Sequence, residues 1–253
     1  MRHQLTLRTF IRTIIVAEAF FNSAWAGPPF VTDDPEPVEY RRWEVNYAVS
    51  KTWRSGSASA GVPSIDMNYG LLPDVQLHAQ PRYALEQNAA GRNIAIDDTE
   101  IGVKYRFLNV EQGESTVMAG IYPLYQMPTG DVRLGPSRGK GQGFLPVWLQ
   151  RSSGKWLAYG GAGYRINPGA GNRNSVFVGS ALLYQFTPKL QLGAEIFHET
   201  ANALGGQSNA GFNLGGKYGL ATDYSLLFSA GKGISNVSAT NQYSLYTALQ
   251  VQY

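Results

Sequence analysis

Hydrophobic and polar residues alternate along most of this chain. At its end, Leu249 and Val251 share one side of an extended strand, and Gln250 between them points to the other. Successive side chains of a β-strand point to opposite faces, so the pattern predicts a strand over residues 243–253 with one hydrophobic face. A final aromatic residue, Tyr253, is typical of transmembrane β-barrels, whose outer face meets lipid.

The same alternation, interrupted by turn residues, predicts twelve strands, with ten or fourteen as alternatives if a hairpin is split or fused. They cover residues 43–53, 64–71, 74–83, 99–108, 115–126, 144–151, 155–166, 175–186, 190–199, 209–218, 223–231 and 241–253. An even number is expected of a bacterial barrel. We therefore predict an all-β fold, an antiparallel up-and-down transmembrane barrel over residues 43–253.

Short and long connections alternate between these strands. The short ones are residues 72–74, 109–114, 152–154, 187–189 and 220–222. The long ones are residues 54–63, 85–98, 127–143, 167–174, 200–208 and 232–240. Outer-membrane barrels have short periplasmic turns and longer outer loops, so both ends of the mature chain are expected on the periplasmic side.

Aromatic residues collect where the predicted strands meet the short turns, as expected at a membrane interface. They are Trp43, Tyr69, Tyr105, Phe107, Trp156, Tyr184, Phe186, Tyr218, Tyr224 and Tyr253. A soluble β-sandwich with aromatic strand ends is the alternative. The strands near Phe144 and Trp156 do not alternate clearly, and the sequence does not fix which of their residues face inward.

Charged and polar residues on the inward faces are the main functional candidates. The predicted pore-lining residues are Glu44, Asp66, His78, Arg82, Glu100, Lys104, Arg106, Glu195 and Lys217. On a lipid face, charges cost roughly 2–4 kcal/mol near the midplane, whereas a lumen tolerates them. Two uses remain open: the charges pair across strands and fill a closed core, or they line a narrow aqueous path that selects solutes.

The first 26 residues have the features of an export signal. Arg2, Arg8 and Arg12 accompany an apolar run over residues 13–21, and the small-x-small pattern of residues 24–26 predicts cleavage before Gly27. A membrane anchor is the alternative, but the run is short for the roughly 20 residues that a spanning helix needs. We predict a signal peptide at residues 1–26.

Composition excludes several classes of function. Removing the signal takes three of 21 basic residues and one of 18 acidic ones, which leaves a net charge of +1 and no argument for nucleic-acid binding. The chain has no cysteine, so it has neither disulfides nor thiolate chemistry. Its mean hydropathy of −0.21 fits a barrel, in which alternate residues line a polar lumen, although a large soluble domain would also fit.

The segment at residues 27–42 contains four prolines and four acidic residues before the first strand. Proline density disfavours a helix or a central strand. We predict that it hangs in the periplasm. The alternative is an acidic plug that folds into the lumen against Arg82, Lys104 and Arg106.

Two stretches of the mature chain resemble a known family. They are GPPFVTDDPEP at residues 27–37 followed by WEVN at 43–46, and the middle motifs YP (122–123), PTGD (128–131), PVWLQ (146–150), GKW (154–156) and YGGAGY (159–164). The chain is thereby similar to the bacterial outer-membrane transporter family labelled "putative meta-pathway of phenol degradation". The resemblance implies a barrel that passes small solutes, with a link to aromatic compounds from the label alone, and no catalytic residues.

Other possible sites have simpler explanations. His78 lies among polar lumen-facing residues, and His198 is at a strand end; neither accompanies a nucleophile motif. Residues 135–140, GPSRGK, are one residue short of a phosphate loop and no helix follows, so we interpret them as a basic outer loop. Its basic residues Arg133, Arg138 and Lys140 could also meet lipopolysaccharide or fold into the pore. No catalytic activity, cofactor or metal is expected.

These patterns together predict a passive outer-membrane channel for small solutes, possible substrates being aromatic or hydrophobic compounds. A non-conducting structural or adhesive barrel is the first alternative, and a lipid-modifying barrel enzyme is the second. The expected partners are outer-membrane lipid and lipopolysaccharide, and the barrel assembly machinery through the C-terminal strand ending at Tyr253.

Overall fold

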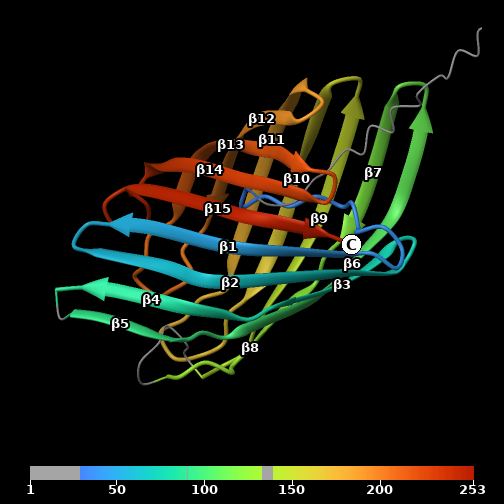
Figure 1. The fold of residues 1–253 in the computed structure, drawn as a ribbon. Helices are drawn as coiled ribbons and strands as arrows, with labels where there is room; N and C mark the ends of the chain where they lie inside the picture. The colour runs from blue at the N-terminus through green and yellow to red at the C-terminus, as the bar shows by residue number, and fades with distance from the viewer. Residues whose placement is uncertain (1–28, 90, 133–138) are drawn as a thin grey trace, which may run out of the picture.

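A computed structural model describes residues 29–89, 91–132 and 139–253. The predicted signal peptide and most of the 135–140 loop lie outside these residues. The strands are β1 (Trp43–Arg54), β2 (Ser57–Leu72), β3 (Val75–Gln80), β4 (Arg82–Asn88), β5 (Gly91–Ile96), β6 (Thr99–Gln112), β7 (Ser115–Ile121), β8 (Leu124–Met127), β9 (Gln142–Ser153), β10 (Trp156–Ile166), β11 (Ser175–Thr187), β12 (Leu190–Glu199), β13 (Asn209–Ala221), β14 (Tyr224–Ser235) and β15 (Tyr243–Gln252). They form a barrel wall (Figure 1).

Three pairs of consecutive strands each form one longer strand of the wall. The first pair is β3 and β4, which both lie beside β2. The second pair is β5 and β6, of which β5 lies beside β4 and β6 lies beside β3. The third pair is β7 and β8, which both lie between β6 and β9. Pro81 separates the first pair and Pro123 lies in the break of the third, since proline has no N–H for the ladder. The wall therefore has twelve strands, as the sequence predicted.

The barrel closes between its first and last strands. β1 pairs antiparallel with both β2 and β15, in a register that places Glu44 opposite Gln252. At the seam, the Trp43 N–H donates to the Tyr253 carbonyl over 2.7 Å, and the Tyr253 N–H donates back over 3.1 Å. Closure pairs backbone groups that would otherwise be unsatisfied in hydrocarbon. The predicted antiparallel barrel is confirmed.

Two of the predicted long connections are wrong. β2 begins at Ser57, so the 54–63 connection is a tight turn, and β4 with β5 fills most of residues 85–98 as a hairpin. Small residues such as Ala58 and Ala60 are buried within this sheet. They contrast weakly in hydrophobicity with the serines and glycines beside them, which hides the alternation in the sequence.

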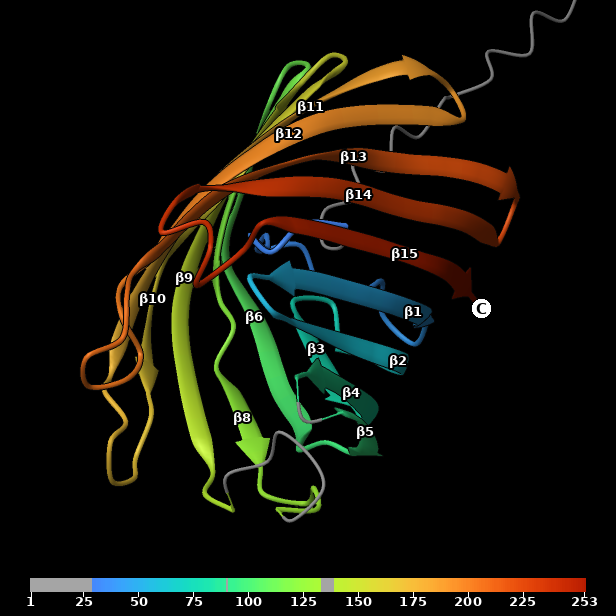
Figure 2. The same cartoon turned by 90° about the vertical axis from the view of Figure 1, so that its left-hand side faces the viewer.

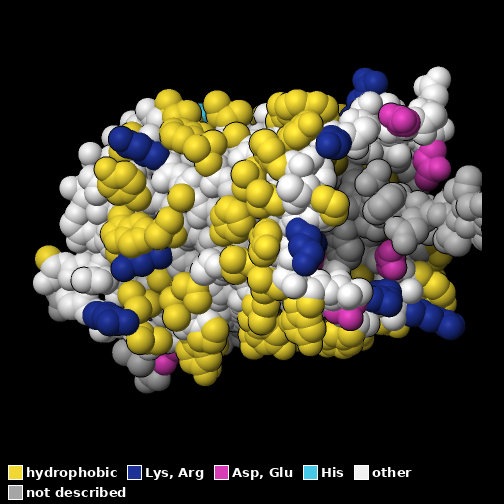
Figure 3. All heavy atoms as spheres, turned by 45° about the horizontal axis from the view of Figure 1, so that its top comes forward, with side chains coloured by type: hydrophobic (Ala, Val, Ile, Leu, Met, Phe, Trp, Pro, Cys, Tyr) yellow, Lys and Arg dark blue, Asp and Glu magenta, His cyan; other side chains and the backbone are white. Residues whose placement is uncertain are grey.

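The outer surface of the barrel is hydrophobic. On neighbouring strands, Leu182, Ile196 and Leu214 are 50%, 56% and 58% exposed, and hydrophobic side chains spread over the face in Figure 3 with few charges among them. Such a surface is unfavourable in water but suits lipid, where outward charges are costly. The protein is an outer-membrane β-barrel with lipid around this face.

Aromatic side chains mark the end of the barrel that carries the short turns. Trp43 packs on Tyr69, and Trp156 packs on Tyr184, each pair with ring centroids 4.7 Å apart. Tyr253 at the same end is exposed. These amphipathic rings suit the level of the lipid headgroups. Within the described residues, no helix is long and apolar enough to cross a bilayer.

Candidate functional site

The N-terminal segment, residues 29–38, lies inside the barrel. The strands enclose it in Figure 2, where it is blue. The backbone N–H groups of Val31 and Thr32 donate to the two carboxylate oxygens of Glu195 on β12, over 3.1 and 2.7 Å. Thr32 and Asp34 are fully buried. The prediction that this segment hangs in the periplasm is therefore wrong, and the physical reason is that wall side chains satisfy the polar groups of a proline-rich chain that cannot join a sheet.

Lys104 on β6 holds the acidic part of the segment. Its Nζ lies 3.0 Å from Asp33 and 3.5 Å from Asp34, and 4.9 Å from the centre of the Tyr122 ring. The Lys104 side chain is only 4% exposed. Burial raises the pKa of Asp34, and the Lys104 ammonium opposes this rise. Removing either member of such a pair would leave an uncompensated buried charge.

The other two basic residues considered for a plug have partners in the wall. Arg82 pairs with Asp97, 2.5 Å away. Arg106 donates to Asp74 near the β2–β3 turn, over 2.9 and 2.7 Å. Of the three basic residues, Lys104 is the one that forms ion pairs with the N-terminal segment.

One side of the lumen packs tightly against the segment; we call it the packed wall, formed by β9, β10, β11 and β12. Phe30 packs on a buried cluster of Leu157, Tyr159, Ala181 and Leu183. A second cluster comprises Tyr122, Phe144, Trp148, Phe177 and Phe197. Gly179 is required here because a Cβ at this position would overlap Thr32 Oγ1. The packed wall thus fixes the segment by close contact.

This packing explains why the facing of β9 was unclear from the sequence. Phe144, Trp148 and Gln150 face inward and are buried, whereas Leu145 and Leu149 face outward and are exposed. The strand alternates strictly in space. Its inward residues are mostly as hydrophobic as its outward ones because Phe144 and Trp148 pack with Phe177 in a buried aromatic cluster.

The opposite side of the lumen is polar; we call it the polar wall, formed by β1, β2, β3 and β6. Asp66 is its centre. It accepts hydrogen bonds from Asn46 Nδ2 (3.1 Å) and Asn68 Nδ2 (2.8 Å), and its Oδ1 lies 3.1 Å from His78 Nδ1. His78 Nε2 lies 3.5 Å from Glu100 Oε1, long for a hydrogen bond.

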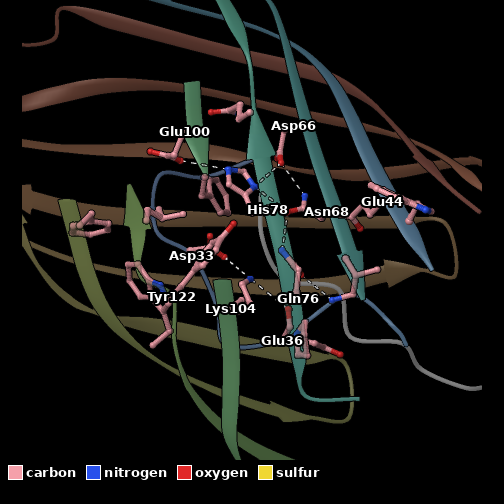
Figure 4. Close-up of a pocket in the computed structure, with 18 of the residues that line it drawn as sticks. Asp33, Glu36, Glu44, Asp66, Asn68, Gln76, His78, Glu100, Lys104 and Tyr122 are labelled. Atoms are coloured by element: carbon pink, nitrogen blue, oxygen red, sulfur yellow. Dashed lines mark hydrogen bonds and ion pairs between the residues drawn. The ribbon is translucent and has the colours of Figure 1, made fainter. Parts of the chain in front are cut away.

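The polar wall also contacts the segment, through Lys104 on β6 and through Gln76 on β3. Gln76 donates to Asn68 Oδ1 over 2.7 Å, and its own carbonyl accepts the Val38 N–H over 2.8 Å. Figure 4 shows this chain of contacts running from Glu100 through His78 and Asn68 to Gln76.

A cavity of about 380 Å³ lies between the polar wall and the segment, and residues of β9 and β10 line part of it. It is lined by Phe30, Val31, Asp33, Glu36, Pro37, Val38, Glu39, Arg42, Trp43, Glu44, Asp66, Asn68, Gln76, His78, Gln80, Glu100, Lys104, Tyr122, Leu124, Phe144, Trp148, Arg165, Tyr246 and Gln252. Trp43 and Gln252 belong to the short-turn end of the barrel, and Arg165 to the opposite end of β10. The cavity therefore runs lengthwise through the lumen beside the segment.

The predicted lumen residues divide into two groups. Glu44, Asp66, His78, Glu100 and Lys104 line the cavity. The other four, Arg82, Arg106, Glu195 and Lys217, do not line it and bind Asp97, Asp74, Asn213 and Gln250 respectively.

Several residues of the cavity were missed by the sequence reasoning. Asn68 and Gln76 are uncharged, but Asn68 binds Asp66 and Gln76 binds the segment. The sequence indicated that Gln76 faces the lumen, because it alternates with the outward residues Val75 and Leu77. Asp33 and Glu36 were recognised as acidic, but nothing local in the sequence indicates which wall they meet. Among the described residues, no cluster of three or more His, Asp or Glu side chains could hold a metal ion.

No protein-family model and no curated protein sequence matches this chain. Among solved structures, the chain is similar to the COG4313 outer membrane channel from Pseudomonas putida F1, with a TM-score of 0.62 and 16% identity over 86% of this chain and 97% of that one. It is also similar to the KdgM porin, with a TM-score of 0.52 and 9% identity over 83% of this chain and 99% of the porin. The chain shares the fold of these barrels. At such low identities, the similarity shows the fold alone.

Proposed function

We propose that this barrel is a passive channel for small solutes, which pass between the polar wall and the seated N-terminal segment. The observation that carries the proposal is the lengthwise cavity of about 380 Å³ with hydrogen-bonding side chains along it. This volume falls within the roughly 300–1,000 Å³ typical of small-molecule sites. Fixed polar groups can replace part of the hydration shell of a solute in a narrow passage.

The chemistry of the lining fits solutes with both polar and hydrophobic parts. Asp66, Asn68 and Gln76 supply polar groups, while Tyr122 and Trp148 supply aromatic surface. We propose that the chain belongs with the outer-membrane transporter family labelled "putative meta-pathway of phenol degradation", which it resembles in sequence motifs. Two barrels of similar fold carry the words channel and porin in their names. Aromatic or hydrophobic compounds are the candidate solutes on this basis.

Single-channel recording in planar lipid bilayers tests the proposal. The refolded protein should produce discrete current steps, small because the segment occupies much of the lumen. Folding is checked by the heat-dependent migration typical of barrels in gels. A folded barrel that never produces steps would contradict the channel proposal.

Uptake by cells that carry or lack this protein tests the class of solute. Faster entry of phenolic than of aliphatic solutes of equal size would support the aromatic candidates. Equal rates for both would leave a general small-solute channel.

A non-conducting structural barrel is the second candidate, and one observation favours it. The segment is fixed to the wall by Glu195, Lys104 and the packing of Phe30. A closed, permanently filled lumen would show the same contacts. The recordings described above separate this candidate from the channel.

A further inference from the structure

The cationic side chains along the cavity are all neutralised by carboxylates. Lys104 lies 3.0 Å from Asp33, Arg165 lies 3.1 Å from Glu199, and Arg42 lies 3.8 Å from Asp223. Glu199 and Asp223 are not part of the cavity lining. Glu199 and Asp223 therefore neutralise Arg165 and Arg42, and the carboxylates that line the cavity are not needed for these two pairs.

The carboxylates along the cavity are in excess. Six of them face it, against three Lys or Arg side chains and one histidine, so the lining is negative by at least two charges even with His78 protonated. Glu36 and Glu44 accept hydrogen bonds from the neutral amides of Gln150 and Gln252. The charge of Arg106 also acts on Glu36 and that of Lys217 on Glu44, but neither of these cations lines the cavity.

Glu100 provides negative charge further along the same path. Its nearest ionic neighbour is His78 Nε2 at 3.5 Å, and His78 also lies 3.1 Å from Asp66, so one ring faces two carboxylates. Figure 4 shows Glu36, Glu44 and Glu100 distributed around the cavity instead of gathered at one point. Negative charge therefore extends along the path.

We propose that this path selects cations over anions, and that Glu36, Glu44 and Glu100 are the residues that determine the selectivity. The inference rests on the proposed channel function and narrows its solutes to cationic or neutral compounds. The physical basis is that rings or rows of carboxylates attract cations and repel anions in a narrow aqueous passage. The buried pair of Lys104 and the half-buried pair of Arg165 add no net positive charge that would offset this.

The test is the reversal potential of the whole protein in a bilayer that separates two KCl concentrations. The wild-type barrel should give a potential of the sign set by K⁺. Glu44→Gln and Glu100→Gln should each lower the ratio of K⁺ to Cl⁻ permeability by about fourfold. Removing a charge across roughly 8 Å of water-like dielectric changes the preference for each ion by about twofold, in opposite directions for K⁺ and Cl⁻. The double variant should bring the ratio closest to one.

Glu114→Gln is the matched control, because Glu114 is exposed in the turn between β6 and β7 and does not line the cavity. Its permeability ratio should equal that of the wild type. In all three variants, glutamine keeps about the size of the glutamate side chain and can still form hydrogen bonds. Heat-dependent gel migration confirms that each variant is folded.

Two results would overturn the inference. Conductance with a preference for Cl⁻, or with a ratio that Glu44→Gln and Glu100→Gln leave unchanged, would refute the selectivity and leave the channel intact. Absence of any conductance would refute the channel itself, and the inference with it.

Discussion

The two walls of the lumen differ in what covers them. The packed wall buries Phe30 of the N-terminal segment against Leu157 and Leu183, and no polar side chain is needed there to meet water. The polar wall has Asp66, bonded by two asparagine amides, facing a cavity. The comparison shows how one segment can divide a twelve-stranded barrel. Its hydrophobic residue Phe30 packs on one wall, while the other wall binds it only through polar groups of Lys104 and Gln76 and keeps a cavity beside it. An empty barrel would have no reason to be so asymmetric.

Removing the segment should have the largest effect. Replacing residues 30–37 by a Gly-Ser sequence of equal length removes Phe30, Asp33 and Asp34, and with them the contacts to the packed wall. Because the segment fills much of the lumen, single-channel conductance should rise several-fold. An equal-length Gly-Ser replacement of residues 201–206, in a loop outside the lumen, is the control. Unchanged conductance in the first variant would show that the segment does not restrict the path.

Lys104→Met should loosen the segment without removing it. The substitution leaves Asp34 fully buried without its cation, and breaking a buried pair costs about 3–5 kcal/mol. The segment should therefore leave its site more often, and limited proteolysis should cleave it faster than in the wild type.

Arg82→Met is the control for this substitution, because Arg82 pairs with Asp97 in the wall and not with the segment. Its proteolysis should match the wild type. Equal protection of the segment in both variants would mean that Lys104 does not hold it.

Acidification should produce a smaller change, in the selectivity of the path. Burial raises the pKa of Glu36 above its ordinary value of 4.5, while a hydrogen bond from Gln150 and the charges of Arg106 and Lys104 oppose the rise, and Glu44 adds to it. A carboxyl with a raised pKa gains its proton at a higher pH than an exposed one. The preference for K⁺ should thus begin to fall before the pH reaches 4.5.

Glu36→Gln checks the residue behind this pH dependence. The variant cannot titrate at this position, so its selectivity should be lower at neutral pH and should change less on mild acidification. Reversal potentials measured between pH 7 and 5 give the comparison. If wild type and variant follow the same curve, Glu36 does not contribute.

Most of the wall could be predicted from the sequence because lipid on one side and a polar lumen on the other impose alternation. β3 and β12 show this clearly, with Gln76 and Glu195 inward and Leu77 and Ile196 outward. The pattern failed on β9, where the inward Trp148 is buried in an aromatic cluster at the edge of the cavity. It also failed over Ala58 and Ala60, whose small side chains give little contrast.

The position of the N-terminal segment could not be predicted for a different reason. Its contacts join residues far apart in the chain, such as Thr32 with Glu195 and Asp33 with Lys104. Hydrophobic and polar patterns report only on residues that are close in the sequence. They therefore predicted an acidic, proline-rich segment but could not predict where in the barrel it lies. Five of the nine predicted lumen residues line the cavity, which the segment itself bounds on one side.

Cysteine accessibility during single-channel recording tests the difference between the two walls most directly. The chain contains no cysteine, so a single introduced thiol is the sole target of a thiol reagent. Glu100→Cys places it on the polar wall beside the cavity, and Ala181→Cys places it on the packed wall in the cluster that Phe30 covers. The reagent should reduce the current through the first variant and leave the second unchanged. Equal block of both, or block at position 181 alone, would contradict passage along the polar wall.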